Sequence, residues 1–226
     1  MNGMRMHWVN RRAAVGLVVV LTVGFAAGGV AQSVAGQAYG SYVNTLAASS
    51  GQSPLAVLPA VSGTDGAEAD AQGSTQDVPG TLSSYFLNSM TSGEIGTAEA
   101  GAQSTATAAN INILSGLITA DEVIANVVSS RTASGAVSNA DGSTFANLVV
   151  AGVPVTSGDA PVAPNTNISL PGVGYVVLNE EIPSGDGVTS SGLTVNMIHV
   201  YLQSLVGGTL QSTGEIIVGS ATSSVS

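Results

Sequence analysis

The sequence of 226 residues contains no cysteine and no lysine. Without cysteine, disulfides, thiolate nucleophiles, iron–sulfur clusters and cysteine zinc sites are excluded. Charged residues make up 8% of the chain and aromatic residues 4%, whereas about 25% of the residues in a typical globular protein are charged. A helical surface held together by Glu/Lys pairs is therefore excluded. The hydrophobic fraction of 44% argues against general disorder, and the core must consist mainly of Val, Ile, Leu and Ala.

The basic residues are concentrated at the N-terminus, where three arginines precede an apolar run from residue 13 to residue 31: Arg5, Arg11 and Arg12. A basic segment, an apolar run and small residues at its end are typical of a secretory signal peptide. We predict that residues 1–31 form a signal helix that is removed after Ala31, with Ala38 as an alternative cleavage site. The other interpretation is an uncleaved membrane anchor, because about 20 apolar residues span a bilayer.

Cleavage after Ala31 leaves a strongly acidic protein. All 14 Asp and Glu residues remain against Arg131 alone, so the net charge is −13. Nucleic acids are excluded as partners because the basic surface that neutralises phosphates is missing. Anionic lipid headgroups are excluded for the same reason, which leaves a membrane as a partner only if the N-terminal segment is uncleaved.

Alternating apolar residues predict strands from Gly93 to Ser130. Within this region Ala109, Ile111 and Ile113 are expected on one face of an extended chain. The segment that begins at Leu193 is apolar on both faces, which is typical of a central strand. Its alternation predicts one face that consists of Leu193, Val195, Met197, His199 and Tyr201. The segment that begins at Glu215 is predicted to be a closing strand.

Two hairpins follow Arg131. In the first, 145–150 is expected to pair with 153–156 across Ala151-Gly152. In the second, 167–170 is expected to pair with 173–178 across Pro171-Gly172, because Pro presets φ and Gly accepts the positive φ that a type II turn requires.

Two earlier segments are predicted not to be strands. Leu82, Tyr85 and Phe86 have helical spacing, which indicates a short helix from 81 to 88. Residues 62–80 combine Gly and Ser with carboxylates and have no apolar period, so we expect a flexible acidic loop. Its carboxylates could instead bind calcium, although no D-x-D-x-D-G spacing is present.

Together these segments predict an all-β fold. We expect one antiparallel β-sandwich-like domain over residues 32–226, after the N-terminal signal helix. The alternative is a β-solenoid, because rows of small residues also suit flat stacked sheets.

The arrangement from about Tyr39 to Val225 resembles the bacterial surface domain called choice-of-anchor P. The resemblance rests on the order and spacing of five segments: INILSGLITADEVIA (111–125), ANLVVAGVPV (146–155), PNTNISLPGVGYVVLNEE (164–181), GLTVNMIHV (192–200) and GEIIVGSATSSV (214–225). It implies an exported domain that different C-terminal anchors attach in different proteins, with no established catalytic role. The sequence shows no LPxTG-like motif, C-terminal apolar helix or basic tail, so we expect any attachment to use an uncleaved N-terminus, a partner or self-association.

His199 is the one histidine that remains after cleavage, so any Ser-His-Asp hydrolase would need it as a base. No G-x-S-x-G nucleophile motif is present, and we interpret His199 as a packed strand histidine with one hydrogen-bond partner. Glu180 and Glu181 are adjacent and should point to opposite faces of a strand, so we interpret them as solvated strand-end charges. A pair of either with Asp121 or Glu122 has no support from spacing.

Two further patterns have structural interpretations. Residues 139–143 carry oxygen ligands at alternate positions, but Asp141-Gly142 predicts a turn without any ion. Arg131 could clamp a carboxylate ligand, and we favour instead a pair with Asp121 or Glu122. The sequence therefore predicts no catalytic residue, no cofactor-binding residue and no metal ligand.

The function expected from these observations is that of a secreted or cell-surface, non-catalytic β-domain with a structural or adhesive role. Strand edges or the loops 157–167 and 183–192 would make its contacts. Its partner would be a cell-envelope or extracellular matrix component, or a second copy. The alternative is a secreted hydrolase that acts on an envelope polymer through His199 or a carboxylate pair, and a third reading is calcium-stabilised adhesion.

Overall fold

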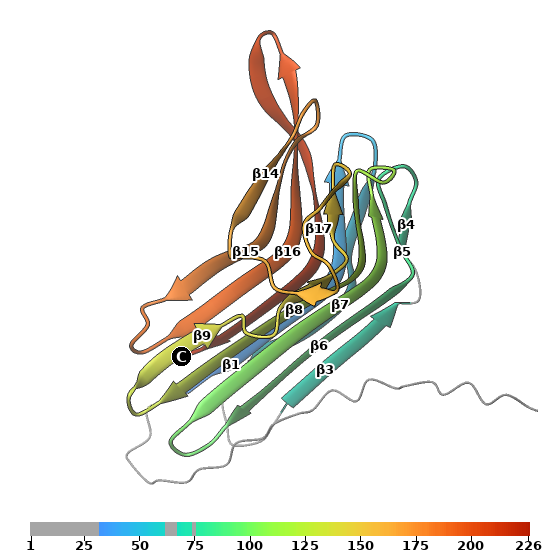
Figure 1. Ribbon diagram of the computed structural model, residues 1–226. Helices are drawn as coiled ribbons and strands as arrows, with labels where there is room; N and C mark the ends of the chain where they lie inside the picture. Colours follow the sequence, from blue (N-terminus) through green and yellow to red (C-terminus); the bar gives the residue numbers. More distant parts are fainter. Residues whose placement is uncertain (1–31, 62–66, 74–75) are drawn as a thin grey trace, which may run out of the picture.

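The computed structural model describes residues 32–61, 67–73 and 76–226. The predicted signal helix, 1–31, lies outside the described residues. The described chain is built from strands and contains no helix, so it also contains no helix that could cross a membrane. Its strands form two antiparallel sheets that pack against each other (Figure 1). The predicted all-β sandwich is confirmed, and the antiparallel pairing rules out the solenoid alternative.

The first sheet has six strands. Their spatial order is β14 (Thr166–Leu170), β15 (Gly174–Gly185), β16 (Ser191–Val206), β17 (Thr209–Val225), β1 (Val34–Thr45) and β2 (Ser49–Val61). The predicted central strand is confirmed, since β16 lies between β15 and β17. The segment from Glu215 is also a strand, and β17 starts earlier and is held between β16 and β1.

The second sheet has eleven strands and is centred on three long ones: β6 (Phe86–Ile95), β7 (Ala100–Ile113) and β8 (Ile118–Thr132). The strands predicted between Gly93 and Ser130 are therefore confirmed. The remaining eight strands are short: β3 (Ala67–Gly73), β4 (Gln76–Val78), β5 (Leu82–Ser84), β9 (Gly135–Asn139), β10 (Thr144–Ala146), β11 (Val149–Val150), β12 (Val153–Pro154) and β13 (Asp159–Ala160).

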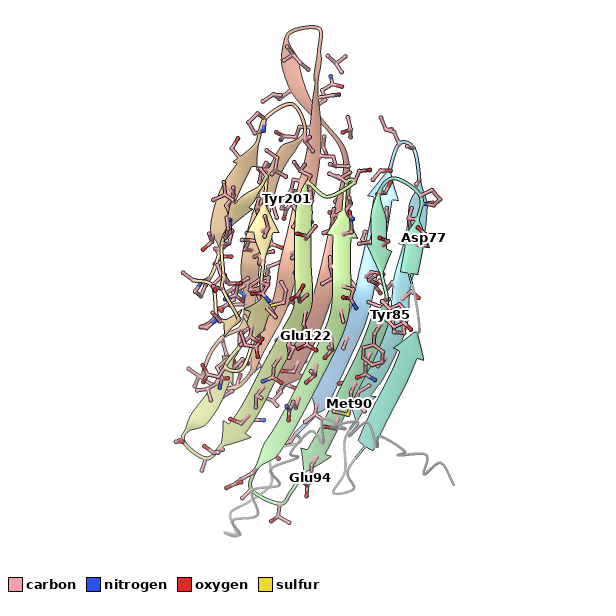
Figure 2. The ribbon with its side chains drawn as sticks, turned by 45° about the vertical axis from the view of Figure 1, so that its right-hand side comes forward. Asp77, Tyr85, Met90, Glu94, Glu122 and Tyr201 are labelled. Atoms are coloured by element: carbon pink, nitrogen blue, oxygen red, sulfur yellow. The ribbon has the colours of Figure 1, made fainter. Side chains whose placement is uncertain are left out.

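The predictions for residues 62–88 were wrong where the structure describes them. The acidic segment contains β3 and β4, and β3 pairs along its whole length with β6 through backbone groups, which do not require an apolar period. The predicted helix consists of β5 and the start of β6. Leu82 is buried in β5, whereas Tyr85 lies between the strands and is exposed (Figure 2). The helical spacing thus comes from two strands that are separated by one residue.

Both predicted hairpins are present. Between β14 and β15, the Val173 N–H donates to the Leu170 carbonyl over 2.9 Å and Gly172 has a φ of 78°, as a type II turn requires. Between β11 and β12, pairing is limited to 149–150 with 153–154. The first hairpin is shorter than predicted because residues 144–146 pair with β8 and β13 instead.

The core lies between the sheets and is largest around Phe145, which is fully buried among Leu, Ile and Val side chains. At the other end, small residues let the sheets approach closely. A Cβ atom on Gly93 would lie 2.7 Å from the Val34 Cγ2 atom. The Ser129 and Ser223 hydroxyls meet across the interface at 2.7 Å. The Ala, Ser and Gly content of the chain is therefore matched to a thin sandwich.

The strands of both sheets are irregular halfway along. Met197 and Ile198 in β16 are consecutive and both fully buried, so one extra residue faces the core. Gly219 in β17 and Asn179 in β15 are level with Met197 and have positive φ values of 67° and 48°. In the second sheet, Asn110 of β7 has a φ of 52°. At each of these levels one residue in both paired strands is left out of the ladder without a change of register, an arrangement called here a bulge, and the strands bend there.

The bend runs through both sheets in one direction (Figure 1). In β7, Ala109 and Asn110 both point away from the core, so the extra residue lies on the outside of the second sheet, whereas in β16 it lies on the core side. In both sheets the extra residue lies on the side that points from the six-stranded sheet toward the second sheet, so both sheets bend in the same direction. The outer face of the six-stranded sheet, which points away from the second sheet, lies on the inside of the bend.

The bend corrects two predictions about faces. Ala109 does not share a face with Ile111 and Ile113, because the bulge at Asn110 reverses the alternation. His199 likewise does not share a face with Met197. It lies on the outer face of β16, where its ring stacks on Tyr201 with centroids 3.9 Å apart.

Candidate functional site

The polar side chains on the outer face gather at the bend. Five of them form the group called here the histidine cluster: Glu180 from β15; Asn196, His199 and Tyr201 from β16; and Glu215 from β17. Strand register places Glu180 opposite Asn196 and Tyr201 opposite Glu215. The bulge at Met197 then brings His199 next to the same Glu180 carboxylate. Residues from three strands meet because the sheet bends toward them.

His199 is held between two carboxylates. Its Nδ1 atom lies 2.7 Å from Glu180 Oε2 and its Nε2 atom lies 3.1 Å from Glu215 Oε2. The His199 and Glu180 side chains are 8% and 13% exposed, and that of Glu215 is 36% exposed. A doubly protonated imidazole donates to both carboxylates, whereas a neutral one has a single N–H. The arrangement is therefore complete only when the ring carries both protons.

Glu180 is the acceptor at the centre of the cluster. Besides His199, it accepts hydrogen bonds from Asn196 Nδ2 at 2.8 Å and from the Tyr201 hydroxyl at 2.6 Å. Burial by itself would raise the pKa of Glu180, but the hydrogen bonds from His199, Tyr201 and Asn196 outweigh it and lower the pKa to about 2. The Glu180 carboxylate thus stays ionised far below neutral pH.

Tyr201 is fixed as a donor. Burial, followed by its hydrogen bond to the Glu180 carboxylate, raises the pKa of the Tyr201 hydroxyl well above its usual range. Its ring also stacks on Tyr175, with centroids 4.7 Å apart and an angle of 13° between the planes. Because the Tyr201 hydroxyl keeps its proton and donates it to Glu180, it is neither a nucleophile nor a base.

No serine is placed to act with His199 in the part of the chain that the structure describes. Both ring nitrogens face carboxylates. Ser220, the nearest serine in the network, donates its hydroxyl to the Asn196 side-chain oxygen at 2.8 Å. The cluster therefore lacks the nucleophile–base pair on which a serine hydrolase depends.

The sequence-based interpretations of these residues were partly right. His199 is a packed strand histidine, as predicted, but it has two partners rather than one. Glu180 is not a solvated strand-end charge, because the bend encloses it. Glu181 does point to the other face of the sheet, and it is paired with Val195, whose side chain faces the core. Burial, and then the negative charge of Asp141, raise the pKa of Glu181. Glu215 was missed as a partner, because only the register of β16 and β17 reveals it.

The predicted partners of Arg131 were wrong. Asp121 and Glu122 lie on the same strand as Arg131, β8 (Figure 2 labels Glu122), and about ten residues at ~3.3 Å each keep them far from Arg131. Asp121 instead accepts a hydrogen bond from Asn147 Nδ2 at 2.7 Å. Within the described residues no carboxylate forms an ion pair with Arg131. The combination of Asp121 or Glu122 with Glu180 is not formed either, since the contacts of Glu180 lie within the histidine cluster.

The segment 139–143 is a turn, as predicted. The Asp141 N–H donates to Asn139 Oδ1 at 3.1 Å, the Ser143 N–H donates to the Ala140 carbonyl at 3.1 Å, and Gly142 has a φ of 91°. Across the described ranges, no three His, Cys, Asp or Glu side chains are grouped to hold a metal ion. The calcium site that the carboxylates of residues 62–80 could form is not tested, because the side chains of Asp65, Glu68 and Asp70 lie outside what the structure describes.

The predicted loop 183–192 is shorter and well defined. Strands β15 and β16 extend into it and leave residues 186–190 as the connection, called here the Asp186 loop. Asp186 Oδ1 accepts the N–H groups of Val188, Thr189 and Ser190 at 2.7–2.9 Å, and Oδ2 accepts the Thr189 hydroxyl at 2.6 Å. Hydrogen bonds from the Thr189 hydroxyl and then from these backbone groups hold the pKa of Asp186 well below its usual range. The loop is thereby closed on itself, and the Val188 side chain points into solvent.

Comparison with known proteins yields no match to a family model, a curated protein or a solved structure.

Proposed function

We propose that this protein is an exported, non-catalytic β-domain with a structural or adhesive role at the cell surface. The observation that carries the proposal is the occupation of both His199 nitrogens by carboxylates, which leaves the one histidine of residues 32–226 without a catalytic geometry. The signal-like N-terminus and the resemblance of five segments to the choice-of-anchor P domain support export and surface location.

The hydrolase alternative has less support from the same contacts. A general base needs a free lone pair within reach of a nucleophile or water. His199 Nε2 faces Glu215, and Nδ1 faces Glu180. A glycosidase needs two carboxyl groups on opposite sides of a sugar bond, one of them with a raised pKa. Here the imidazole ring occupies the space between the two carboxylates, and the pKa of Glu180 is lowered to about 2.

The histidine cluster is better suited to holding the bend. It joins β15, β16 and β17 through side chains at the level where the bulges interrupt regular pairing. Tyr39 from the strand β1, which lies beside β17, is near Ser220 and Gln52, and burial raises the pKa of its hydroxyl. Such cross-links give a rigid scaffold, which is what loops need in order to present a binding surface.

We place a contact surface on the Asp186 loop. Three backbone N–H groups and the Thr189 hydroxyl donate to the one Asp186 carboxylate, so binding would require little ordering of the loop. It also presents Val188, an exposed apolar side chain, at the connection between two long strands. The other predicted loop, 157–167, is tied to the fold by Asn147, whose side-chain oxygen accepts the Gly158 N–H at 2.8 Å.

The test is a sedimentation assay with cell envelopes from the producing bacterium. We expect the protein to pellet with the envelopes and the Val188→Asp variant to lose most of this binding, because a charge replaces the apolar contact. Val153→Asp is the matched control, since Val153 is similarly exposed on β12. Equal binding by both variants and the wild type would refute the placement on this loop. Release of soluble fragments from the envelopes by the wild type, lost in His199→Gln, would refute the non-catalytic role.

A further inference from the structure

The hairpin between β16 and β17 extends beyond the rest of its sheet. Strand β15 begins at Gly174, opposite Leu202, and β1 ends at Thr45, opposite Gly214. The Gln203 N–H still donates to the Val173 carbonyl at 2.8 Å. Residues 204–211, called here the tip hairpin, pair only with each other, and both of their edges are free (Figure 1). A free edge presents unpaired N–H and C=O groups to any strand that approaches.

The turn of the tip hairpin determines which groups face outward. Gly207 and Gly208 have φ values of 60° and 85°, which is the type I′ turn that suits a two-residue hairpin. Such a turn is closed by a hydrogen bond between its flanking residues, Val206 and Thr209. Because hydrogen-bonded and non-bonded pairs alternate in antiparallel strands, Leu205 and Leu210 form a non-bonded pair. Their backbone groups consequently point away from the hairpin, toward the free edges.

The side chains of the tip hairpin are apolar and uncharged. Leu205, Val206 and Leu210 are 69%, 51% and 65% exposed. Leu205 and Leu210 lie directly opposite each other and so share one face. No charged residue occurs between Gln203 and Thr213, in a chain whose net charge is −10. The repulsion between two copies of this acidic protein is therefore low at the tip.

Several other free edges of the described sheets carry features that oppose strand addition. The outermost strand β2 contains Pro54, and β3 contains Glu68 and Asp70. The part of β15 beyond β14 contains Glu180, Glu181 and Pro183. Proline and charge are common means of protecting an edge. The tip hairpin has neither, and although the edge strand β14 also has neither, the apolar side chains of β14 are not exposed as those of the tip are.

The chemistry of the tip favours another strand as its occupant. Insertion into lipid would take the outward backbone groups of Leu205 and Leu210 into hydrocarbon without partners, which is costly. A second tip hairpin that pairs along β16 satisfies the outward groups of Leu205, leaves those of Leu210 in water and brings the leucines of the two copies side by side. The pairing of two identical β16 edges in antiparallel orientation also has two-fold symmetry, so each copy gives and receives the same contacts.

We propose that two copies of this protein associate through their tip hairpins, by antiparallel pairing of residues 204–206 of β16. Three residues on each side bury far less than the ~1,200 Å² of a stable interface, so the dimer is weak and forms at high local concentration. Added salt strengthens it, because screening reduces the repulsion between the two acidic bodies.

The experiment is sedimentation equilibrium of the full chain over a concentration series from about 10 μM to 1 mM, in 0.05 M and 0.5 M NaCl. We expect the weight-average mass to rise from monomer toward dimer with concentration, and at lower concentration in high salt. The double variant Leu205→Lys/Leu210→Lys is expected to stay monomeric throughout, with the affinity weakened at least 10-fold. The control, Leu46→Lys/Val153→Lys, adds the same charge at two exposed positions elsewhere and should associate like the wild type.

Three results would overturn the proposal: a wild type that remains monomeric at 1 mM in high salt, a tip variant that associates as the wild type does, or a control that loses association equally. A parallel flotation assay with neutral phosphatidylcholine vesicles addresses the other occupant. Binding of the monomeric wild type to vesicles that is lost in the tip variant would identify lipid in place of a second copy. Circular dichroism of both double variants establishes that they keep the β-fold.

Discussion

The strongest energetic prediction concerns Glu180, whose carboxylate joins the strands at the bend. A carboxyl whose pKa is lowered in the folded protein stabilises it at pH values above the ordinary pKa, and this contribution is lost as the pH falls toward the folded value. For Glu180 these values are 4.5 and about 2. The contribution should therefore be present at pH 5 and mostly lost by pH 3.

The expected magnitude follows from these two values. With 1.36 kcal/mol for each pKa unit, a shift from 4.5 to about 2 changes the unfolding free energy by about 2 kcal/mol between pH 5 and pH 3. Residual exposure of the carboxylate reduces this to about 1–2 kcal/mol. The chosen window lies below the range in which histidines ordinarily titrate, so it reports mainly on carboxyl groups.

The assay is urea unfolding of the wild type and of Glu180→Gln at pH 5 and pH 3. The stability difference between the two proteins should be about 1–2 kcal/mol smaller at pH 3 than at pH 5. Glu181→Gln is the matched control on the opposite face of the same strand. Since burial raises the pKa of Glu181, its ionised form opposes folding, and this variant should gain stability at neutral pH and lose that advantage in acid. A Glu180→Gln variant whose stability runs parallel to that of the wild type would refute the role given to the cluster.

Two further predictions test the bend and the thin interface. Gly219→Ala should destabilise the fold by about 2–4 kcal/mol, because φ is 67° there and the new Cβ atom would lie 3.0 Å from Val123 Cγ1. Thermal unfolding measures this loss, and an unchanged Tm would show that the bend tolerates an ordinary residue at this position. Gly93→Ala should cost about 1–3 kcal/mol, because its Cβ atom would lie 2.7 Å from Val34 and 2.8 Å from Leu58. Gly51→Ala, where nothing lies within 4 Å of the added atom, is the control and should unfold at the wild-type urea concentration; equal losses for both would contradict close sheet packing.

The regular parts of this fold were predictable from local patterns. Alternation alone identified β7 and β8, because both strands have one face on the core over most of their length. The Pro171-Gly172 turn was found because its residue types match the φ values of a type II turn. These signals are local and do not depend on which strand lies beside which.

The bend was not predictable in the same way. Met197 looks like any core residue at an alternate position, and nothing in the residues around it marks the extra core-facing position. Asn110, Asn179 and Gly219 adopt positive φ, but other Asn and Gly residues within the described strands, such as Asn112 and Gly101, do not, so the residue type alone does not mark the bend. As a result the sequence placed His199 and Met197 on the same face, and the structure separates them.

The partners of His199 depend on strand register over long distances. Glu215 reaches Nε2 because β17 pairs with β16 so that Glu215 lies opposite Tyr201, two residues from His199. Glu180 reaches Nδ1 because of the bulge. Neither relation follows from spacing along the chain, so a histidine between two carboxylates could not be recognised before the sheet was known.

The most direct test of the proposed surface role is to separate producing cells into medium, envelope, membrane and cytosol and to measure the intact mass of the protein in each fraction. The proposal predicts a protein in the medium or envelope with a mass that begins at Gln32, or at Tyr39 for the alternative cleavage site. A full-length chain that begins at Met1 and remains in the cytosol would contradict export, and with it the adhesive or structural role outside the cell.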